Sequence, residues 1–179
     1  MIRADLSGVG ILIVDDSAFI CRLLTTMLRG FGAQHIHQAA TCAEAVYEIR
    51  ERLPDIVFVD WELGEGENGL SVVRFIRSGE SPDPFVPIVM ITSHTGRHRV
   101  IEARDAGVNM ILAKPFSPQT VYARLLAVIA RPVEFIRTKS YFGPDRRHFV
   151  GVDYKGEERR AHSAPSVAVP ARVELSRTA

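Results

Sequence analysis

Carboxylate side chains follow directly after two of the short apolar runs in this 179-residue sequence. Asp15 and Asp16 end the stretch "ILIVDD", and Asp60 ends the stretch "IVFVD". Like charges that converge on one place repel one another, so three such carboxylates require a cation close by. A hard divalent cation with oxygen ligands suits them, and Mg²⁺ in such a setting commonly binds phosphoryl oxygens as well. The acidic residues therefore predict a Mg²⁺ site that handles a phosphoryl group.

Two further polar residues complete the set, because Thr92 and Lys114 each follow another apolar run. A lysine adds a second positive charge, and the hydroxyl of Thr92 can donate a hydrogen bond to a phosphoryl oxygen. A carboxylate can attack phosphorus and form an aspartyl phosphate. Asp60 stands alone at the end of its run, which makes it the predicted nucleophile. Each of these residues alone would be an ordinary turn or surface residue, but together they predict a reactive site.

The apolar runs themselves predict strands. They are rich in Val and Ile and apolar at successive positions, which is typical of strands covered on both faces of a parallel sheet. Three clear candidates and two weaker ones cover residues 9–14, 56–60 and 85–92, and residues 34–40 and 109–113.

Helix-like stretches separate these runs. Thr41 and Glu44 have the spacing of a capping box, and Ser117 before Pro118 gives an N-cap with proline at the first helical position. Gly107 marks a helix end. Strand and helix alternate five times, which predicts an α/β fold with a doubly wound five-stranded parallel sheet, flavodoxin-like (βα)5. The carboxyl ends of its strands share one edge, so the polar residues above should converge there.

Positive charge is concentrated behind this pattern. Residues 1–130 hold 12 Lys and Arg against 15 Asp and Glu, a net charge of −3, whereas residues 131–179 hold 10 against 6, a net charge of +4. The hydrophobic periodicity also stops after residue 130. We therefore expect a folded domain over residues 8–130 and an irregular basic extension over residues 131–179, rich in Arg, Pro and Gly and partly docked or disordered.

The extension contains a loose repeat. Residues 141–147, "YFGPDRR", and residues 154–160, "YKGEERR", share the pattern Y-x-G-x-[DE]-R-R at a 13-residue offset. Arginine binds carboxylates and phosphoryl groups in a bidentate manner, and aromatic side chains anchor such contacts. The predicted partner-binding residues are Tyr141, Phe142, Arg146, Arg147, Arg159 and Arg160.

Several other classes of protein are not indicated. No apolar stretch reaches the roughly 18–20 residues of a membrane span, and the start does not resemble a signal peptide, so we expect a cytoplasmic protein without a membrane partner. Cys21 and Cys42 lack CxxC spacing, so neither a disulfide nor a cysteine–metal site is expected. The extension shows no succession of three helices, and a DNA-binding domain is therefore not expected.

The stretches "ILIVDDS", "IVFVDWEL", "VMITS" and "AKPF", in this order and spacing, resemble the response-regulator receiver (CheY-like) family of two-component signalling. The resemblance covers about residues 8–130. It implies a stand-alone phosphorylation switch that phosphorylates and dephosphorylates only itself, with Mg²⁺ as cofactor, and not an enzyme with a separate substrate. The donor would be a sensor histidine kinase or a histidine phosphotransfer protein, and the output would be contact with another protein. Homodimer formation is left open.

By the same resemblance each site residue receives a role. The phospho-acceptor, the switch hydroxyl and the phosphate contact fall on Asp60, Thr92 and Lys114. The Mg²⁺ ligands fall on Asp60, Asp16 directly, Asp15 through water and Glu62 through its backbone carbonyl. A cis peptide is implied between Lys114 and Pro115.

Two positions depart from the family pattern. Ile111 stands three residues before Lys114, where the family usually has Tyr or Phe, so an aromatic rotamer swing is not expected. The loop "DWELGEGENGL" after the acceptor lacks the usual Met-Pro and is one residue longer before Gly69. Activation must therefore be transmitted in another way.

Three alternatives use similar parts. A haloacid-dehalogenase-type phosphatase also has a nucleophilic Asp, a hydroxyl, a Lys and an acidic pair, but its D-x-D motif comes first and its acidic pair last. It also needs a second acid as general acid, and none is evident. A flavodoxin would carry a hydroxyl- and Gly-rich phosphate loop after the first strand, where this sequence has Asp15 and Asp16. A receiver-like scaffold that is never phosphorylated would not need the intact acidic pair and Lys114.

Overall fold

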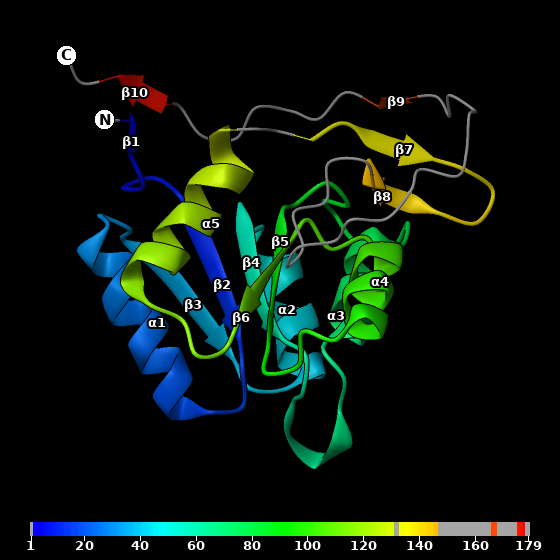
Figure 1. Ribbon diagram of the computed structural model, residues 1–179, viewed down its shortest axis with the longest axis horizontal. Coiled ribbons are helices and arrows are strands. Elements are labelled where there is room, and N and C mark those ends of the chain that lie inside the picture. The colour runs from blue at the N-terminus through cyan, green and yellow to red at the C-terminus, as the bar shows by residue number, and fades with distance from the viewer. Residues whose placement is uncertain (1, 131–132, 147–165, 168–174, 178–179) are drawn as a thin grey trace.

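The structure of the protein is a computed structural model that describes residues 2–130, 133–146, 166–167 and 175–177. Its central sheet has five parallel strands in the order β3-β2-β4-β5-β6 (Figure 1). The strands are β2 (Gly10–Val14), β3 (His35–Ala39), β4 (Ile56–Asp60), β5 (Ile88–Thr92) and β6 (Met110–Ala113). This order confirms the predicted doubly wound, flavodoxin-like sheet, including its two weaker strands.

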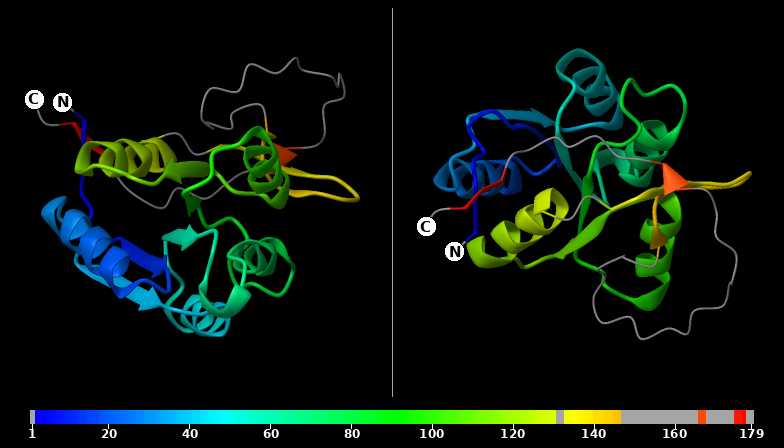
Figure 2. Two further views of the ribbon diagram at one scale, coloured as in Figure 1. Left: turned by 60° about the horizontal axis from the view of Figure 1, so that its bottom comes forward. Right: turned by 90° about the horizontal axis from the view of Figure 1, so that it is seen from above.

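Helices cover both faces of the sheet (Figure 2). One face carries α1 (Ala18–Gly30) and α5 (Pro118–Ala130), and the other carries α2 (Cys42–Arg52), α3 (Leu70–Arg77) and α4 (Arg97–Ala106). Alternate residues of β2 enter the two cores: Ile11 and Ile13 join the core with α1 and α5, and Leu12 and Val14 join the other. The apolar run is continuous because neither face of the strand meets water.

Local signals fix the helix ends as the sequence predicts. Thr41 Oγ1 accepts a hydrogen bond from the N–H of Glu44 at 3.1 Å, and Glu44 Oε2 accepts one from the N–H of Ala40 at 2.8 Å. Ser117 Oγ accepts one from the N–H of Thr120 at 3.2 Å at the start of α5. Gly107 ends α4 with φ of 99°, in the left-handed region that favours glycine.

The loop between β4 and α3 is a compact turn that protrudes at the carboxyl edge of the sheet (Figure 1). Glu62 and Asn68 form an isolated antiparallel bridge across it, and a 3-10 turn, η1 (Gly64–Gly66), forms its tip. At Gly69 the chain returns so close to β4 that a Cβ atom there would overlap the carbonyl oxygen of Asp60. Glycine at this position therefore lets the loop close directly over the end of β4.

The basic extension forms a second, smaller sheet. In it β7 (Phe135–Arg137) pairs antiparallel with both β8 (Phe142–Pro144) and β9 (Ser166–Val167). A further antiparallel pair joins β1 (Ile2–Ala4) to β10 (Leu175–Arg177). Figures 1 and 2 show β7 and β8 at the amino edge of the central sheet, near the end of α4 and away from the β4–α3 loop.

Three phenylalanines attach the extension to the body. The ring centroids of Phe85, Phe135 and Phe142 lie 5.2 to 5.5 Å apart, and Phe135 is only 1% exposed. Residues 133–146 are therefore docked, and the predicted domain boundary at residue 130 stays a prediction.

Among the described residues, no helix combines the length and the apolar composition that crossing a membrane requires.

Candidate functional site

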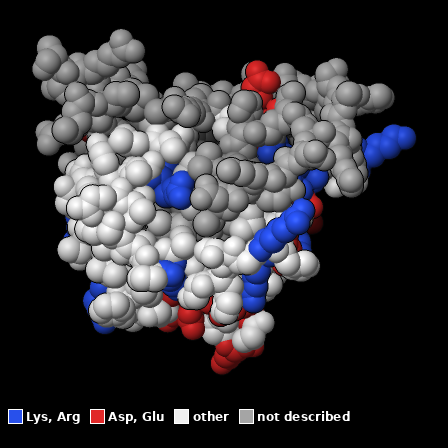
Figure 3. Space-filling view, viewed as in Figure 1, with Lys and Arg blue, Asp and Glu red and all other residues white. Residues whose placement is uncertain are grey.

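Three carboxylates meet at the carboxyl edge of the sheet. Asp15 and Asp16 follow β2, Asp60 ends β4, and one oxygen of each lies within 4.8 Å of the others. Asp15 and Asp60 are 1% and 6% exposed, whereas Asp16 is exposed. Acidic side chains are gathered at this end of the face drawn in Figure 3. A set of carboxylate oxygens open to solvent on one side fits a hard cation such as Mg²⁺, which keeps some of its waters.

Lys114 lies against two of these carboxylates. Its Nζ is 2.7 Å from Asp60 Oδ2 and 3.3 Å from Asp15 Oδ2. The backbone N–H of Lys114 donates to the carbonyl of Thr92 at 2.8 Å, and the peptide between Lys114 and Pro115 is cis, as the resemblance implies. The lysine is thus held at the end of β6 with its charge directed at the predicted acceptor.

Backbone groups orient the two buried carboxylates in the same way. Asp15 Oδ1 accepts a hydrogen bond from the N–H of Ser17 at 2.8 Å, and Asp60 Oδ1 accepts one from the N–H of Trp61 at 2.9 Å. In each residue the second oxygen, Oδ2, is the one that faces Lys114. Both side chains are therefore positioned before any ligand binds.

Burial dominates the electrostatics of this cluster. Burial raises the pKa of Asp15 and of Asp60. Lys114 acts to lower both pKa values, but its effect is smaller than that of burial, so both stay raised. Burial acts to lower the pKa of Lys114, but the hydrogen bond to Asp60 and the charges of Asp60 and Asp15 raise it. One lysine cannot neutralise two buried carboxylates, so the cluster retains an affinity for further positive charge.

Thr92 ends β5, and Ile111 lies in the adjacent strand β6. Thr92 is 2% exposed, and its Oγ1 accepts a hydrogen bond from the N–H of His94 at 3.0 Å. Its hydroxyl also lies 3.2 Å from the carbonyl of His94. Ile111 is 1% exposed and packs in the core beneath α4. The position thus holds a fixed aliphatic side chain, as predicted, and no aromatic ring.

The sequence as a whole settles which family has this arrangement. The family model described as "Response regulator receiver domain" matches residues 11–126. The chain belongs to the response regulator receiver family. The matched range includes Asp15, Asp16 and Asp60 of the acidic cluster as well as Lys114.

Individual relatives agree with this assignment. The "DNA-binding response regulator MtrA" of Mycolicibacterium paratuberculosis is 36% identical over 121 residues, which are 68% of this chain and 51% of the relative. The "Chemotaxis protein CheY1" of Helicobacter pylori is 35% identical over 120 residues, 66% of this chain and 95% of the relative. The chain spans about half the length of the MtrA relatives that it matches and nearly all of CheY1.

Solved structures resemble the receiver equally well. The chemotaxis protein CheY4 of Vibrio cholerae superposes with a TM-score of 0.62 at 28% identity, covering 67% of this chain and 98% of CheY4. A two-component response regulator from Clostridium difficile gives a TM-score of 0.62 at 28% identity, covering 69% of this chain and 97% of that one. The likeness is confined to about two thirds of the chain.

The side chain of Glu62 contacts residues for which the sequence predicted no role at the site. Its Oε1 lies 3.2 Å from Arg99 Nη2 and 3.7 Å from His94 Nδ1. The guanidinium carbon of Arg99 in turn lies 4.7 Å from the ring centroid of Trp61. Arg99 escaped prediction because it lies within a polar helix that starts after the fourth strand run, and no spacing rule connects it to residues 61 and 62.

Of the predicted partner-binding residues, Tyr141, Phe142 and Arg146 are described, and they lie elsewhere, at the amino edge. Phe142 packs in the phenylalanine cluster, and the guanidinium carbon of Arg146 lies 3.8 Å from the ring centroid of Tyr141. Arg146 also pairs with Asp105 of α4 at 3.3 Å. Phe142 and Arg146 thus contact the receiver itself, and Arg147, Arg159 and Arg160 lie outside the described residues.

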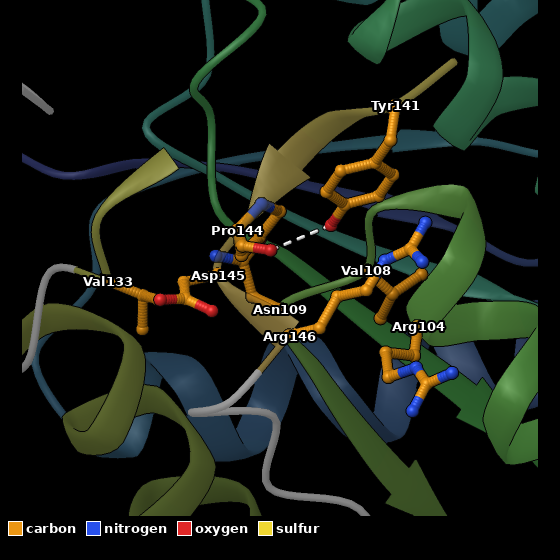
Figure 4. A pocket seen from close by; sticks show the side chains of 8 residues that line it. All are labelled: Arg104, Val108, Asn109, Val133, Tyr141, Pro144, Asp145 and Arg146. Atoms are coloured by element: carbon orange, nitrogen blue, oxygen red, sulfur yellow. Dashed lines mark hydrogen bonds between the residues drawn. The ribbon is translucent and has the colours of Figure 1, made fainter. Parts of the chain in front are cut away.

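A pocket lies at this junction of the extension and α4 (Figure 4). It is shallow and is lined by Arg104, Val108, Asn109, Val133, Tyr141, Pro144, Asp145 and Arg146. Tyr141 donates a hydrogen bond to the carbonyl of Pro144 at 2.7 Å across it. None of these residues belongs to the acidic cluster, so the pocket and the candidate site are separate places.

Proposed function

We propose that this receiver is a phosphorylation-dependent signalling switch whose phospho-acceptor is Asp60. The observation that carries the proposal is the contact of Lys114 Nζ with Asp60 Oδ2 at 2.7 Å inside the three-carboxylate cluster. Lysine favours the ionised form of the acceptor and is placed to meet a phosphoryl oxygen. Asp15 shares this lysine, but its contact with Lys114 Nζ is longer, at 3.3 Å.

The reaction exchanges one bond to phosphorus for another. One oxygen of the Asp60 carboxylate forms a bond to the phosphorus of a phosphohistidine donor, while the bond from phosphorus to the imidazole nitrogen breaks. The imidazole leaves with the electron pair and takes up a proton from solvent. Asp15, Asp16, Asp60 and the carbonyl of Glu62 would hold Mg²⁺, which supplies positive charge against the phosphoryl oxygens.

The hydroxyl of Thr92 would respond to phosphorylation of Asp60 by changing its hydrogen-bond partner. Its present partners are backbone atoms of His94, and a phosphoryl group on Asp60 offers it a charged acceptor instead. Exchange of partners would move the start of the loop between β5 and α4. This movement gives the switch its two states without any change at Ile111.

The partners follow from this chemistry. The donor is a sensor histidine kinase or a histidine phosphotransfer protein, and the output is contact with another protein in the cytoplasm. The receiver acts on no separate substrate, because acceptor and product are the same side chain. A haloacid-type phosphatase is disfavoured by the family match over residues 11–126.

Labelling by a small phosphodonor tests the acceptor. Incubation with acetyl phosphate and Mg²⁺, followed by intact mass, should add one phosphoryl group to the wild-type protein. Asp60→Asn should gain none, because an amide is a poor nucleophile towards phosphorus. Asp55→Asn is the matched control, since Asp55 lies next to the opposite end of β4 and an Asn can still accept the hydrogen bond from the N–H of Gly10.

Two outcomes would contradict the proposal. Undiminished labelling of Asp60→Asn would move the acceptor elsewhere. A wild-type protein that stays unlabelled with several donors would favour the scaffold that is never phosphorylated.

A further inference from the structure

Arg99 contacts the two residues that follow the acceptor. It lies in the first turn of α4, with its guanidinium carbon 4.7 Å from the ring centroid of Trp61 and its Nη2 3.2 Å from Glu62 Oε1. Trp61 is 3% exposed and belongs to the core beneath α4. The arginine therefore stacks on a buried ring directly beside the site.

Trp61 and Glu62 both act on the site through their backbones. The N–H of Trp61 donates to Asp60 Oδ1 at 2.9 Å and lies 2.9 Å from the carbonyl of Ile91. The proposed function makes the carbonyl of Glu62 a Mg²⁺ ligand. A side chain that fixes this two-residue segment thus fixes an acceptor oxygen and a metal ligand together.

The loop that follows supplies little stiffness of its own. It contains Gly64, Gly66 and Gly69 and no proline between residues 61 and 70. Glycine leaves a backbone more conformations than any other residue, and proline would restrict them. A restraint from outside the loop is therefore worth more here than in a loop stiffened by proline.

Of the two contacts of Arg99, the stacking is the stronger restraint. Glu62 is 61% exposed, and ion pairs in such surroundings contribute little because solvent screens them. Trp is the best ring for a cation, and this one is buried on its other side. The planar guanidinium also stacks flat on a ring, which a lysine ammonium cannot do.

We infer that Arg99 is a positioning residue of the receiver site, which holds Trp61 and Glu62 so that the Glu62 carbonyl is in place for Mg²⁺. The inference rests on the proposed function. It also gives α4 a direct mechanical link to the acceptor, in a receiver whose usual aromatic switch position is Ile111.

The sign of one substitution separates positioning from charge. Removing a positive charge near a cation site should strengthen Mg²⁺ binding if only electrostatics matter. Loss of positioning should weaken it instead. Arg99→Gln is therefore expected to lower Mg²⁺ affinity about three- to tenfold by isothermal titration calorimetry, the factor that a lost cation–π contact corresponds to.

The matched control is Arg104→Gln. It removes the same charge from the same helix, and the contacts of Arg104 are with neighbouring Asp105 and not with Trp61. Its Mg²⁺ affinity should equal that of the wild-type protein or exceed it. Arg99→Lys keeps the charge without flat stacking and should lie between the wild type and Arg99→Gln, which preserves a test if Arg99→Gln folds poorly.

A second readout follows the stack itself. Trp61 is the single tryptophan of the chain, so its emission reports this segment alone. In the wild-type protein Mg²⁺ should change that emission, and in Arg99→Gln the change should need correspondingly more Mg²⁺. Mg²⁺ affinity in Arg99→Gln equal to or above that of Arg104→Gln overturns the inference, even if the melting temperature falls.

Failure of the inference differs from failure of the proposed function. If the wild-type protein is labelled on Asp60 and binds Mg²⁺ while Arg99→Gln behaves identically, only the inference is wrong. If the wild-type protein neither binds Mg²⁺ nor is labelled, the proposed function is wrong and the inference with it.

Discussion

The two edges of the central sheet both bury charge, and they treat it in opposite ways. At the carboxyl edge Asp15 and Asp60 share one lysine, and burial raises the pKa of both carboxyl groups. At the amino edge Arg77 is 7% exposed and its donors are matched by acceptors. Buried carboxylates that one lysine does not balance mark the place where a ligand is expected, whereas a buried cation whose donors all find acceptors marks a structural joint.

The matched arginine connects four parts of the chain. Arg77, at the end of α3, donates through its three nitrogens at 2.6 to 2.9 Å to the carbonyls of Pro84, Val86 and Gly107 and to Oδ1 of Asn109. Its guanidinium carbon also lies 5.0 Å from the ring centroid of Phe135 in the extension. The loops before β5 and β6 and the docked extension thus share one cation.

The largest effect is therefore expected at the amino edge. Arg77→Met should lower the free energy of unfolding by at least about 3 kcal/mol, because four acceptors lose their donor and each unmatched buried group costs about 1–3 kcal/mol. Urea unfolding measures the loss. Phosphoryl labelling of the folded protein should be unchanged.

Arg74→Met is the control for this variant. Arg74 lies on the exposed side of α3, so its replacement should stay within about 0.5 kcal/mol. Equal stability of the two variants would show that the hydrogen bonds of Arg77 do not hold this edge together.

The site at the carboxyl edge could be predicted from the sequence, because residues that follow successive strands of a parallel sheet come to lie close together at one edge. Asp15, Asp60, Thr92 and Lys114 each come directly after or at the end of a strand run, and the carboxyl ends of those strands share one edge. No knowledge of side-chain packing is needed for this step. Lys114 already supplies part of the positive charge that the buried carboxylates of Asp15 and Asp60 require.

The amino edge could not be predicted in this way. Arg77 binds mostly backbone carbonyls, which every residue offers, so its partners leave no mark on the sequence. A basic residue in the last turn of a helix also reads as an ordinary surface residue. Gly143 packs so tightly on Gly107 that a Cβ would come within 3.0 Å of the Gly107 Cα, and this fit depends on tertiary structure alone.

The repeat in the extension shows the same limit. Its aromatic and basic residues suggested anchors for a partner, and in the structure Phe142 and Arg146 contact the receiver body, while the ring of Tyr141 lies against Arg146. Aromatic and basic residues predict that a segment makes contacts, but they do not show whether the contacts are with a partner or with the protein's own domain. Partner binding by the repeat stays a prediction, and any partner of Phe142 or Arg146 must compete with the body.

A smaller effect of opposite sign is expected at the carboxyl edge. Without Mg²⁺, Asp60→Asn should raise the free energy of unfolding by on the order of 1 kcal/mol at neutral pH, because it removes one of two repelling buried charges. Lys114 keeps Asp15 as a partner at 3.3 Å. Urea unfolding in the presence of a chelator measures the gain, and Asp55→Asn should show none.

The pH dependence of this gain has a definite sign. Because the pKa of Asp60 is raised above its ordinary value of 3.8, the folded protein holds the proton more tightly than the unfolded chain. Lowering the pH therefore stabilises the wild-type protein relative to Asp60→Asn, and the gain should shrink as the pH falls through the raised pKa towards 3.8. A gain that grows on acidification would mean that the carboxylate is stabilised by its surroundings.

The smallest expected effect tests whether the two edges are independent. Tyr141 donates to the carbonyl of Pro144 at 2.7 Å, and its ring lies beneath Arg146. Tyr141→Phe removes the hydroxyl and keeps the ring, so it should cost about 0.5–1 kcal/mol of unfolding free energy, the usual value of one hydrogen bond. Urea unfolding beside the wild-type protein resolves a loss of this size when both share one m-value.

The same variant should leave the carboxyl edge untouched, because none of the residues around Tyr141 contributes to the acidic cluster. Mg²⁺ affinity and the rate of phosphoryl labelling should therefore equal those of the wild-type protein. A change in either would mean that α4, which meets Trp61 through Arg99 at one end and Arg146 through Asp105 at the other, transmits strain between the edges. Repeating Tyr141→Phe with Arg99→Gln would then decide the route, since a double-mutant cycle shows coupling only if α4 carries it through Arg99.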